Sequence, residues 1–162
     1  MKNKNLSFMT QAAMIAAIYM VLTYIFAPFS FGEVQVRISE ALTILPIFTP
    51  AAIPGLFAGC LIGNILGGAI LPDIVFGSIA TLIGAFFTWK LREQKPVVAT
   101  FPPIISNIII VPFVLRYGYG VTLPIPFMML TVGIGEVISC TVLGLVVYGA
   151  LKKYKSTLFR TA

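Results

Sequence analysis

The residues best suited to chemistry are concentrated in one short stretch, 31–46, with the sequence FGEVQVRISEALTILP. It contains Glu33 and Glu40, two of the five acidic residues of the chain, together with Arg37. Ionisable groups among apolar segments are costly unless they meet a partner, a cavity or water, so we interpret this stretch as the rim of a binding site. We expect residues 33–37 to form a gate over that site. The alternative is that Arg37 and Glu40, three residues apart on a helix, only pair with each other.

The composition is that of an integral membrane protein. The 162 residues are 59% hydrophobic and 10% charged, whereas soluble domains carry about 25% charged residues. The net charge of +6 lies in short flanks of apolar segments, which points to membrane topology rather than to nucleic acid. Histidine is absent from the sequence, which excludes histidine-based catalysis and metal binding. We expect neither an enzyme nor a cofactor, and we interpret Cys60 and Cys140 as small packing residues.

Proline and polar residues divide the chain into six predicted helices, which form one all-α domain over residues 1–162. The second helix spans only about 20 Å, less than the ~30 Å hydrocarbon core. Such a short helix, flanked by irregular backbone, is tolerated at membrane depth only where it lines protein or water. Asp73 is predicted to cap the start of the fourth helix. The expected ranges are 6–27, 36–48, 54–71, 73–91, 97–115 and 124–151.

Small residues recur at four-residue spacing on the first and third helices. The first helix carries two overlapping pairs, Ala12/Ala16 and Ala13/Ala17. Small residues at this spacing let another helix approach closely, and the spacing leaves open whether that helix belongs to this chain or to a partner. On the third helix we expect the ladder to form a packing groove. Its members are Gly55, Gly59, Gly63 and Gly67.

The distribution of Lys and Arg predicts six spans with both termini in the cytoplasm. Basic residues are enriched on the cytoplasmic side of membrane proteins. With this topology only Arg37 and Arg116 lie outside. The nine residues on the cytoplasmic side are Lys2, Lys4, Lys90, Arg92, Lys95, Lys152, Lys153, Lys155 and Arg160.

The same topology places four polar side chains at similar depth, in the outer half of the membrane. Glu40, Asn64, Asn107 and Glu136 lie about 6 to 18 Å below the outer helix ends at 1.5 Å per residue. Polar groups inside a membrane are costly in free energy. Four groups that converge on one pocket explain their presence better than four separate groups that face lipid. We therefore expect one outward-facing polar pocket built from four helices.

The chain lacks the motifs of ATP hydrolysis and of common hydrolases. It contains no phosphate-binding loop (G-x-x-x-x-G-K-[ST]), no H-E-x-x-H and no G-x-S-x-G. A small helical membrane protein with a polar pocket and no energy source of its own is typical of the binding subunit of a larger assembly.

The run VQVRISEALTILP at 34–46 resembles the signature of the QueT family, the queuosine-precursor S components of energy-coupling factor (ECF) transporters. The resemblance extends to the basic N-terminus, the alanine-rich first helix, the glycine ladder and the basic tail. It implies six helices in a bacterial cell membrane and a module of two ATPase subunits and a transmembrane coupling protein. It also implies that one face of the first helix docks on that coupling protein. The residues on this face are Ala12, Ala13, Ala16 and Ala17.

The substrate implied by the resemblance is a 7-deazaguanine precursor of queuosine, in particular its 7-aminomethyl form. A carboxylate can accept both adjacent N–H groups of a guanine-like edge, and a second carboxylate can pair with the aminomethyl cation. We assign the edge to Glu136 and the cation to Glu40. A donor for the ring carbonyl is expected from Asn107, Asn64 or Arg37. Outer aromatic residues that either stack on the ring or form an interfacial belt are Phe31, Tyr117 and Tyr119.

Two other functions are compatible with the sequence. One is a stand-alone channel or facilitator for a small solute, which would transport without partners. The other is a membrane scaffold subunit in which helix packing through small residues is the whole function. The scaffold hypothesis leaves the buried Glu136 without a role.

Overall fold

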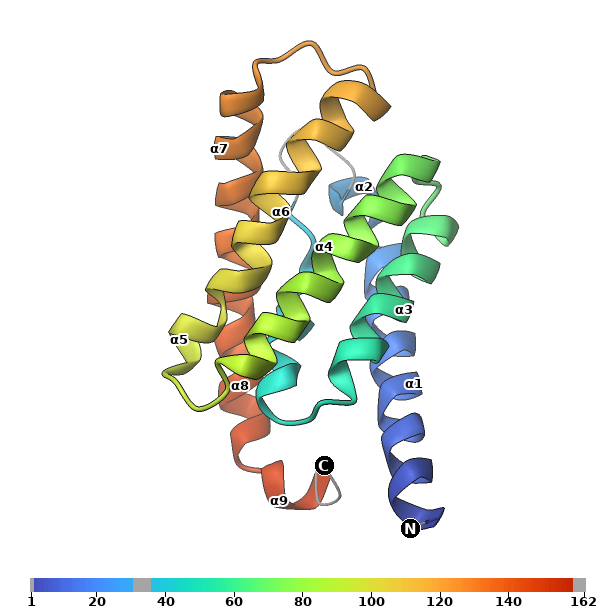
Figure 1. Cartoon of the computed structure of the whole chain (residues 1–162), viewed down its shortest axis with the longest axis vertical. Coiled ribbons are helices and arrows are strands. Elements are labelled where there is room, and N and C mark those ends of the chain that lie inside the picture. Colours follow the sequence, from blue (N-terminus) through green and yellow to red (C-terminus); the bar gives the residue numbers. More distant parts are fainter. Residues whose placement is uncertain (1, 31–35, 159–162) are drawn as a thin grey trace.

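The computed structural model describes residues 2–30 and 36–158, and all regular structure within these ranges is helical. Six helical segments occur close to the expected positions, which confirms the all-α class. Figure 1 shows α1, α3, α4, α6 and α7 following one another across the molecule. The segments are α1 (Lys2–Ile25), η1 (Ile38–Ile47), α3 (Ala52–Leu66), α4 (Leu71–Lys90), α5, α6 and η2 (Pro96–Ala99, Phe101–Phe113 and Val114–Gly118), and α7, η3 and α8 (Ile125–Glu136, Val137–Leu143 and Gly144–Lys152). Two short helices, α2 (Ala27–Ser30) and α9 (Lys155–Leu158), complete the described chain.

Four segments are long and apolar enough to cross a membrane. They comprise Lys4–Ile25, Leu71–Lys90, Pro96–Gly118 and Ile125–Lys152, with 20 to 28 residues each. The segments η1 and α3 are shorter, with 10 and 15 residues. The protein is thus a multi-pass, all-helical membrane protein. Six crossings with cytoplasmic termini remain a prediction from the sequence.

Three members of the glycine ladder, Gly55, Gly59 and Gly63, pack against α1 as their spacing predicts, whereas Gly67 follows the end of α3 as its C-cap. A Cβ atom at Gly55 would lie 2.7 Å from the carbonyl oxygen of Ala12, and one at Gly59 would lie 2.8 Å from that of Ala16. Only residues without a side chain permit backbones to approach this closely. Ala12 and Ala16 are therefore used for contacts inside the chain.

A second close approach joins α4 to α6. A Cβ at Gly84 would lie 2.6 Å from the Cα of Pro103, so the first turn of α6 sits directly on α4. Further out, Pro112 lies inside α6 and the helix continues as the π-helical segment η2. The helices α1, α3, α4 and α6 are thus each packed against the next, and η1 packs against the first three of them.

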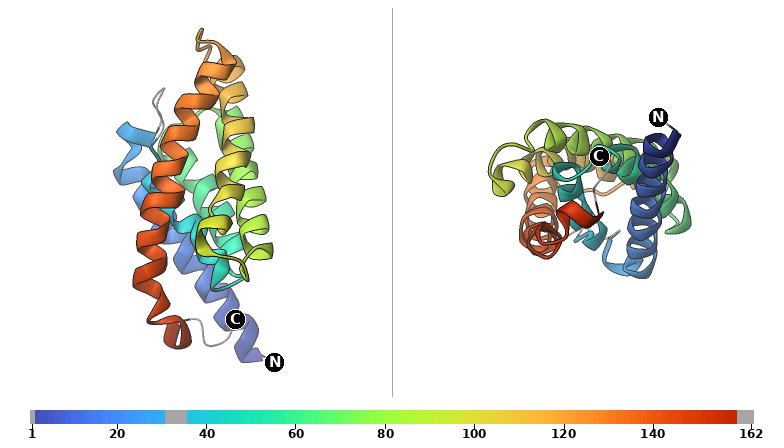
Figure 2. Two further views of the ribbon diagram at one scale, coloured as in Figure 1. Left: turned by 90° about the vertical axis from the view of Figure 1, so that its left-hand side faces the viewer. Right: turned by 90° about the horizontal axis from the view of Figure 1, so that it is seen from below.

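The short helix η1 is the central element of the fold. It is a 3-10 helix rather than the expected α-helix, and its residues 39–46 are all buried. It contacts α1, α3, α4, η3 and α8. Figure 2, in the view from below, shows this segment between α1 and the C-terminal helices. A polar residue on η1 therefore faces protein from several sides, as expected for a short helix at membrane depth.

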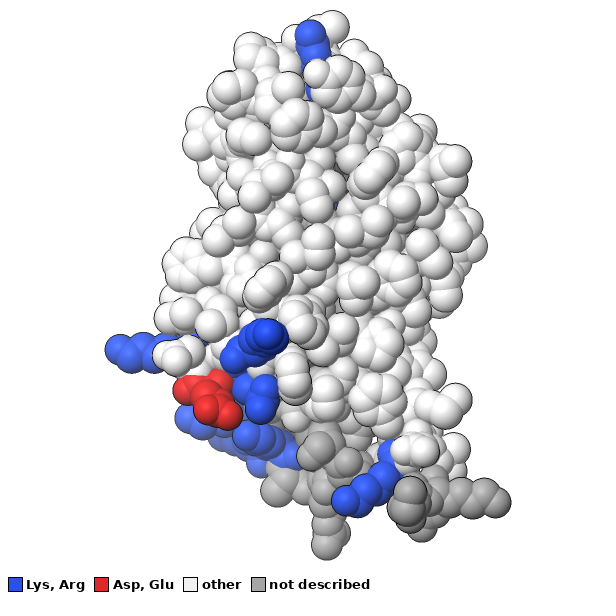
Figure 3. Space-filling view, viewed as in Figure 1, with Lys and Arg blue, Asp and Glu red and all other residues white. Residues whose placement is uncertain are grey.

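Both termini lie at the same end of the molecule, away from the connection between η2 and α7 (Figure 1). Figure 3 shows that Lys and Arg gather at this terminal end, and that the surface above it is mostly uncharged on the face shown. This arrangement agrees with the charge asymmetry of the sequence.

Candidate functional site

Four charged side chains are buried in the described part of the chain, and they lie in two connected clusters. Glu40 and Glu136 belong to an inner cluster, and Arg37 and Asp73 to an outer cluster nearer the η2–α7 end. Each of the four is at most 3% exposed. One base and three acids thus share the interior of an apolar bundle.

Glu40 stands at the centre of the inner cluster. Its Oε1 accepts a hydrogen bond from the hydroxyl of Tyr19 on α1 and a second, 3.2 Å long, from Thr81 on α4. Its Oε2 is buried and has no hydrogen-bond partner in the described structure. An unsatisfied buried carboxylate oxygen costs free energy, so this atom marks a position where a donor from a ligand would be stabilised.

Glu136 approaches Glu40 from the other side of the bundle. It ends α7, where the backbone passes into the π-helical segment η3, a distortion that is frequent at functional sites. The Cys140 thiol donates to Glu136 Oε2 over 3.2 Å, and the side chain of Asn107 on α6 interacts with the same carboxyl group. The Ser139 hydroxyl nearby is buried without a partner. Three elements therefore build this half of the site.

The ligand atoms of Glu40, Glu136 and Cys140 all lie within 4.8 Å of one another. Two carboxylates at this spacing can bridge a cation, which would be either a metal ion or a protonated amine of an organic ligand. The set contains two hard oxygen donors and one soft thiol, with no histidine in the chain. A protonated amine can donate hydrogen bonds to both carboxylates.

The outer cluster is a buried ion pair that the sequence analysis did not anticipate. Arg37 Nη2 lies 3.3 Å from Asp73 Oδ2 and 3.4 Å from Oδ1. The interpretation of Asp73 as a helix cap is wrong, because Ile70 occupies the cap of α4 and the Asp73 carboxylate faces Arg37. The alternative in which Arg37 and Glu40 only pair with each other is wrong for the same reason.

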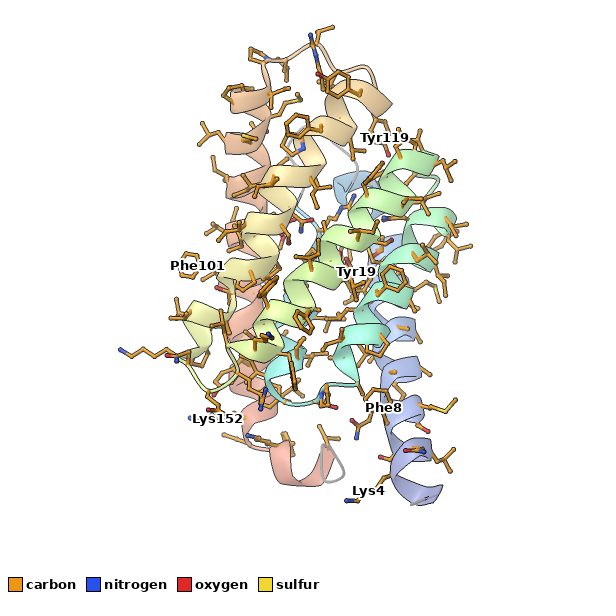
Figure 4. The ribbon with its side chains drawn as sticks, in the orientation of Figure 1. Lys4, Phe8, Tyr19, Phe101, Tyr119 and Lys152 are labelled. Atoms are coloured by element: carbon orange, nitrogen blue, oxygen red, sulfur yellow. The ribbon has the colours of Figure 1, made fainter. Side chains whose placement is uncertain are left out.

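Tyr119 closes the outer cluster from the connection after η2. Its hydroxyl donates to Asp73 Oδ2 over 3.0 Å. Partial burial, together with the nearby Asp73 carboxylate, raises the pKa of Tyr119 to about 12. The phenol is therefore protonated at neutral pH and remains a donor. Figure 4 shows Tyr119 nearer the η2–α7 end and Tyr19 deeper in the bundle.

Asn64, Cys60 and Thr81 connect the two clusters. The Asn64 amide nitrogen lies 3.4 Å from the Asp73 carbonyl oxygen and 3.6 Å from Cys60 Sγ. Thr81 contacts Cys60 over 3.4 Å and also donates to Glu40. The buried Oδ1 of Asn64 has no partner. Gly77 lets these side chains approach the α4 backbone closely, since a Cβ there would lie 2.9 Å from Asp73 Oδ1 and 3.3 Å from Asn64 Nδ2.

The structure brings most of the predicted site residues together. Glu40, Glu136 and Asn107 form the inner cluster, and Arg37 and Asn64 belong to the outer one. Glu33 lies outside the described residues, as does most of the proposed gate at 33–37.

Three contributors were missed by the sequence analysis, namely Tyr19, Asp73 and Thr81. Asp73 begins the fourth helix and Arg37 precedes the second, so the depth argument used for the other polar residues would have placed them at one level. Tyr19 is fully buried on the α1 face that also carries Ile15 and Thr23. Four-residue spacing of these three residues is a signal that could have predicted this shared face.

The alanine pairs of α1 divide between two faces. Ala12 and Ala16 are half-buried and face α3, whereas Ala13 and Ala17 are exposed. Of the outer aromatic residues, Tyr119 belongs to the outer cluster and Tyr117 does not. Tyr117 is 77% exposed and stacks on Phe113, away from the buried clusters.

These features define a class of protein, namely multi-pass helical membrane proteins with buried ionisable side chains in their interior. Such buried groups are typical of transport proteins. A family model described as "QueT transporter" matches residues 9–153, which is most of the chain. The chain belongs to the QueT transporter family, as the sequence resemblance indicated.

A curated relative supports the same assignment. Over 84 residues, the chain is 32% identical to the "Queuosine precursor transporter QueT" of Lactococcus lactis subsp. cremoris (strain MG1363). The match covers 51% of this chain and 48% of the relative, so the chain spans about half the length of the curated relative it matches. The comparison with solved structures found no match to this chain.

Proposed function

We propose that this protein is the substrate-binding membrane subunit, or S component, of an ECF importer, and that it captures 7-aminomethyl-7-deazaguanine. Membership of the QueT transporter family and the name of the Lactococcus relative support a transport role for a queuosine precursor. The ATPase subunits and the coupling protein are part of the proposal, since the chain carries no ATP-binding motif of its own.

The observation that carries the substrate assignment is the charge of the buried site. Arg37 forms a salt bridge with Asp73, whereas Glu40 and Glu136 lie close together, and no salt bridge to either is seen among the described residues. Burying two such carboxylates is costly unless they take up protons or meet a cation. A ligand that brings an ammonium group supplies that cation on binding.

The arrangement of donors and acceptors suits both ends of the proposed ligand. Oε1 of Glu40 already accepts from Tyr19 and Thr81, which leaves Oε2 as the free acceptor for an aminomethyl group. Glu136 is the proposed acceptor for the guanine-like edge, in place of its weak thiol donor Cys140. The amide of Asn107 is then the proposed donor for the ring carbonyl.

The exposed half of the alanine motif is the proposed docking surface for the coupling protein. Ala13 and Ala17 present small side chains away from α3, so a helix of another protein can approach there. Ala12 and Ala16 support this surface from inside by holding α1 against α3. In this proposal both termini lie in the cytoplasm and the clusters open outward through the bacterial cell membrane.

Calorimetric titration of the purified protein in mild detergent tests the binding proposal. We expect 7-aminomethyl-7-deazaguanine to bind, and Glu40→Gln or Glu136→Gln to weaken it at least about tenfold, because each puts an NH₂ group where an acceptor is needed. Glu93→Gln is the matched control, since Glu93 is exposed beside Arg92. Titrations with and without EDTA distinguish an ammonium site from a metal site. Unchanged affinity in both buried variants, with the protein folded, would contradict the proposal.

Reconstitution separates the S component from the other two functions. Proteoliposomes that contain only this protein should bind the ligand without concentrating it, and uptake should require the ATPases, the coupling protein and ATP. Uptake by the protein alone would establish a facilitator. Absence of binding, with the fold intact, would favour a scaffold.

A further inference from the structure

Arg37 is the one buried base among the described residues, and its salt-bridge partner is Asp73 rather than Glu40 or Glu136. Its carboxylate meets Arg37 at 3.3 Å and is itself held by the Tyr119 hydroxyl at 3.0 Å. The side chains of Arg37 and Asp73 are only 4% and 1% exposed, so solvent screens this pair poorly. Arg37 also interacts electrostatically with Glu40 and Glu136. The position of Arg37, and the neutralisation of its charge by Asp73, therefore affect the net charge around a ligand bound at Glu40 and Glu136.

The four buried charges form a balance that depends on Asp73. With Asp73 ionised, Arg37 is compensated locally and the two inner carboxylates remain available to a cation. If Asp73 were neutral, the Arg37 charge would instead compensate part of the charge on Glu40 and Glu136. The site would then favour a neutral ligand more than it does now, without any change in the residues that contact the ligand.

We propose that Asp73 determines the charge specificity of the site: by holding and neutralising Arg37, it makes the Glu40–Glu136 cluster select a cationic ligand over a neutral one of the same shape. This inference rests on the proposed binding function and adds a residue outside the ligand-binding set. Asp73 acts through Arg37 and is therefore a positioning residue. Tyr119 has the supporting role of fixing the Asp73 carboxylate.

The expected size follows from Coulomb's law. A unit charge within roughly 10 Å of a bound cation, at an effective dielectric constant of about 20, changes the dissociation constant by about tenfold or more. The matched ligands are 7-aminomethyl-7-deazaguanine, which is a cation, and 7-hydroxymethyl-7-deazaguanine, which has nearly the same shape and is neutral. The measured quantity is the ratio of their dissociation constants, because a general loss of packing weakens both ligands alike.

The test uses variants whose predicted effects on this ratio have opposite signs. Asp73→Asn should lower the preference for the cation about tenfold, and Asp73→Glu should restore part of it. Arg37→Gln should raise the preference, since it removes a positive charge and leaves three acids. The double variant Arg37→Gln/Asp73→Asn removes both charges and should return the ratio close to that of the wild type. A merely structural role for the pair predicts instead the same ratio in every variant, because a loss of packing weakens both ligands alike.

The outcomes are distinguishable from those of the binding proposal. A wild-type protein that binds neither ligand refutes the proposed function and this inference with it. A wild-type protein that prefers the cation, with the same ratio in Asp73→Asn and Arg37→Gln, refutes this inference alone. Should Asp73→Asn fail to fold, Arg37→Gln tests the sign of the effect and the double variant tests the charge balance, since removal of a complete buried pair is tolerated better than removal of one partner. Loss of the cation preference in the folded double variant overturns the proposal.

Discussion

The close contact between α1 and α3 gives a prediction that links packing to the binding site. In Gly59→Ala, the new Cβ would lie 2.8 Å from the carbonyl oxygen of Ala16 and 2.8 Å from the Cβ of Tyr19. Both are atoms of α1 at or next to its backbone, so no side-chain rotation can relieve the contact. The helix itself must move outward, and Tyr19, whose hydroxyl donates to Glu40, must move with it.

The magnitude follows from two opposing terms. Overpacking of a tight contact costs about 1–3 kcal/mol. Replacing glycine by alanine within a helix returns about 0.5–1 kcal/mol. We therefore expect a net loss of about 1–2 kcal/mol in the free energy of unfolding. For a chain of this length, that loss lowers the melting temperature by roughly 2–8 °C.

Thermal unfolding in mild detergent measures this loss, and Gly149→Ala is the matched control. A Cβ at Gly149, in α8, meets nothing within 4 Å, so this variant keeps the helix gain without the clash. It should melt at or slightly above the wild-type temperature. Ligand affinity should fall in Gly59→Ala, because Tyr19 is displaced from Glu40, and should stay unchanged in Gly149→Ala.

Two results would refute this reasoning. A melting temperature of Gly59→Ala equal to or above that of Gly149→Ala would mean that α1 and α3 are not in close contact. A destabilised Gly59→Ala protein with wild-type affinity would show that the position of Tyr19 does not govern the state of Glu40.

Three further predictions concern docking, titration and topology. Ala13→Leu and Ala17→Leu should abolish ATP-driven uptake while ligand binding to the isolated protein survives, with Ala150→Leu, an exposed position on α8, as the control; equal loss of binding and uptake would assign these alanines to internal packing. The pKa of Tyr119 is raised above its usual value of 10, so its stabilising contribution is complete below pH 10 and is lost as the pH rises to about 12. The difference in melting temperature between wild type and Tyr119→Phe should therefore shrink over that interval, and a constant difference would show that the phenol does not titrate there. In intact cells a membrane-impermeant maleimide should label Thr122→Cys but not Gln94→Cys, because these exposed positions lie in connections at opposite ends and both native cysteines are buried; the reverse pattern would invert the topology.

The sequence alone determined the class, the helices and most of the polar residues of the site. An apolar segment of 15 to 28 residues can satisfy its backbone hydrogen bonds within itself only as a helix, so composition and proline positions were sufficient to place the helices. The glycine ladder fixed which face of α3 takes a close neighbour. Glu40, Asn107 and Glu136 were predicted to converge because isolated polar groups in lipid are too costly.

Only the tertiary structure decided which of these groups are partners. The pairing of Arg37 with Asp73 brings together residues 36 positions apart, and a helix-cap role for Asp73 satisfied the local sequence equally well. Likewise, the spacing of Ala12, Ala13, Ala16 and Ala17 is the same for both pairs, and only the position of α3 buries one pair and exposes the other. Local spacing determines which side chains share a helix face, whereas the relative rotation of packed helices determines what that face meets.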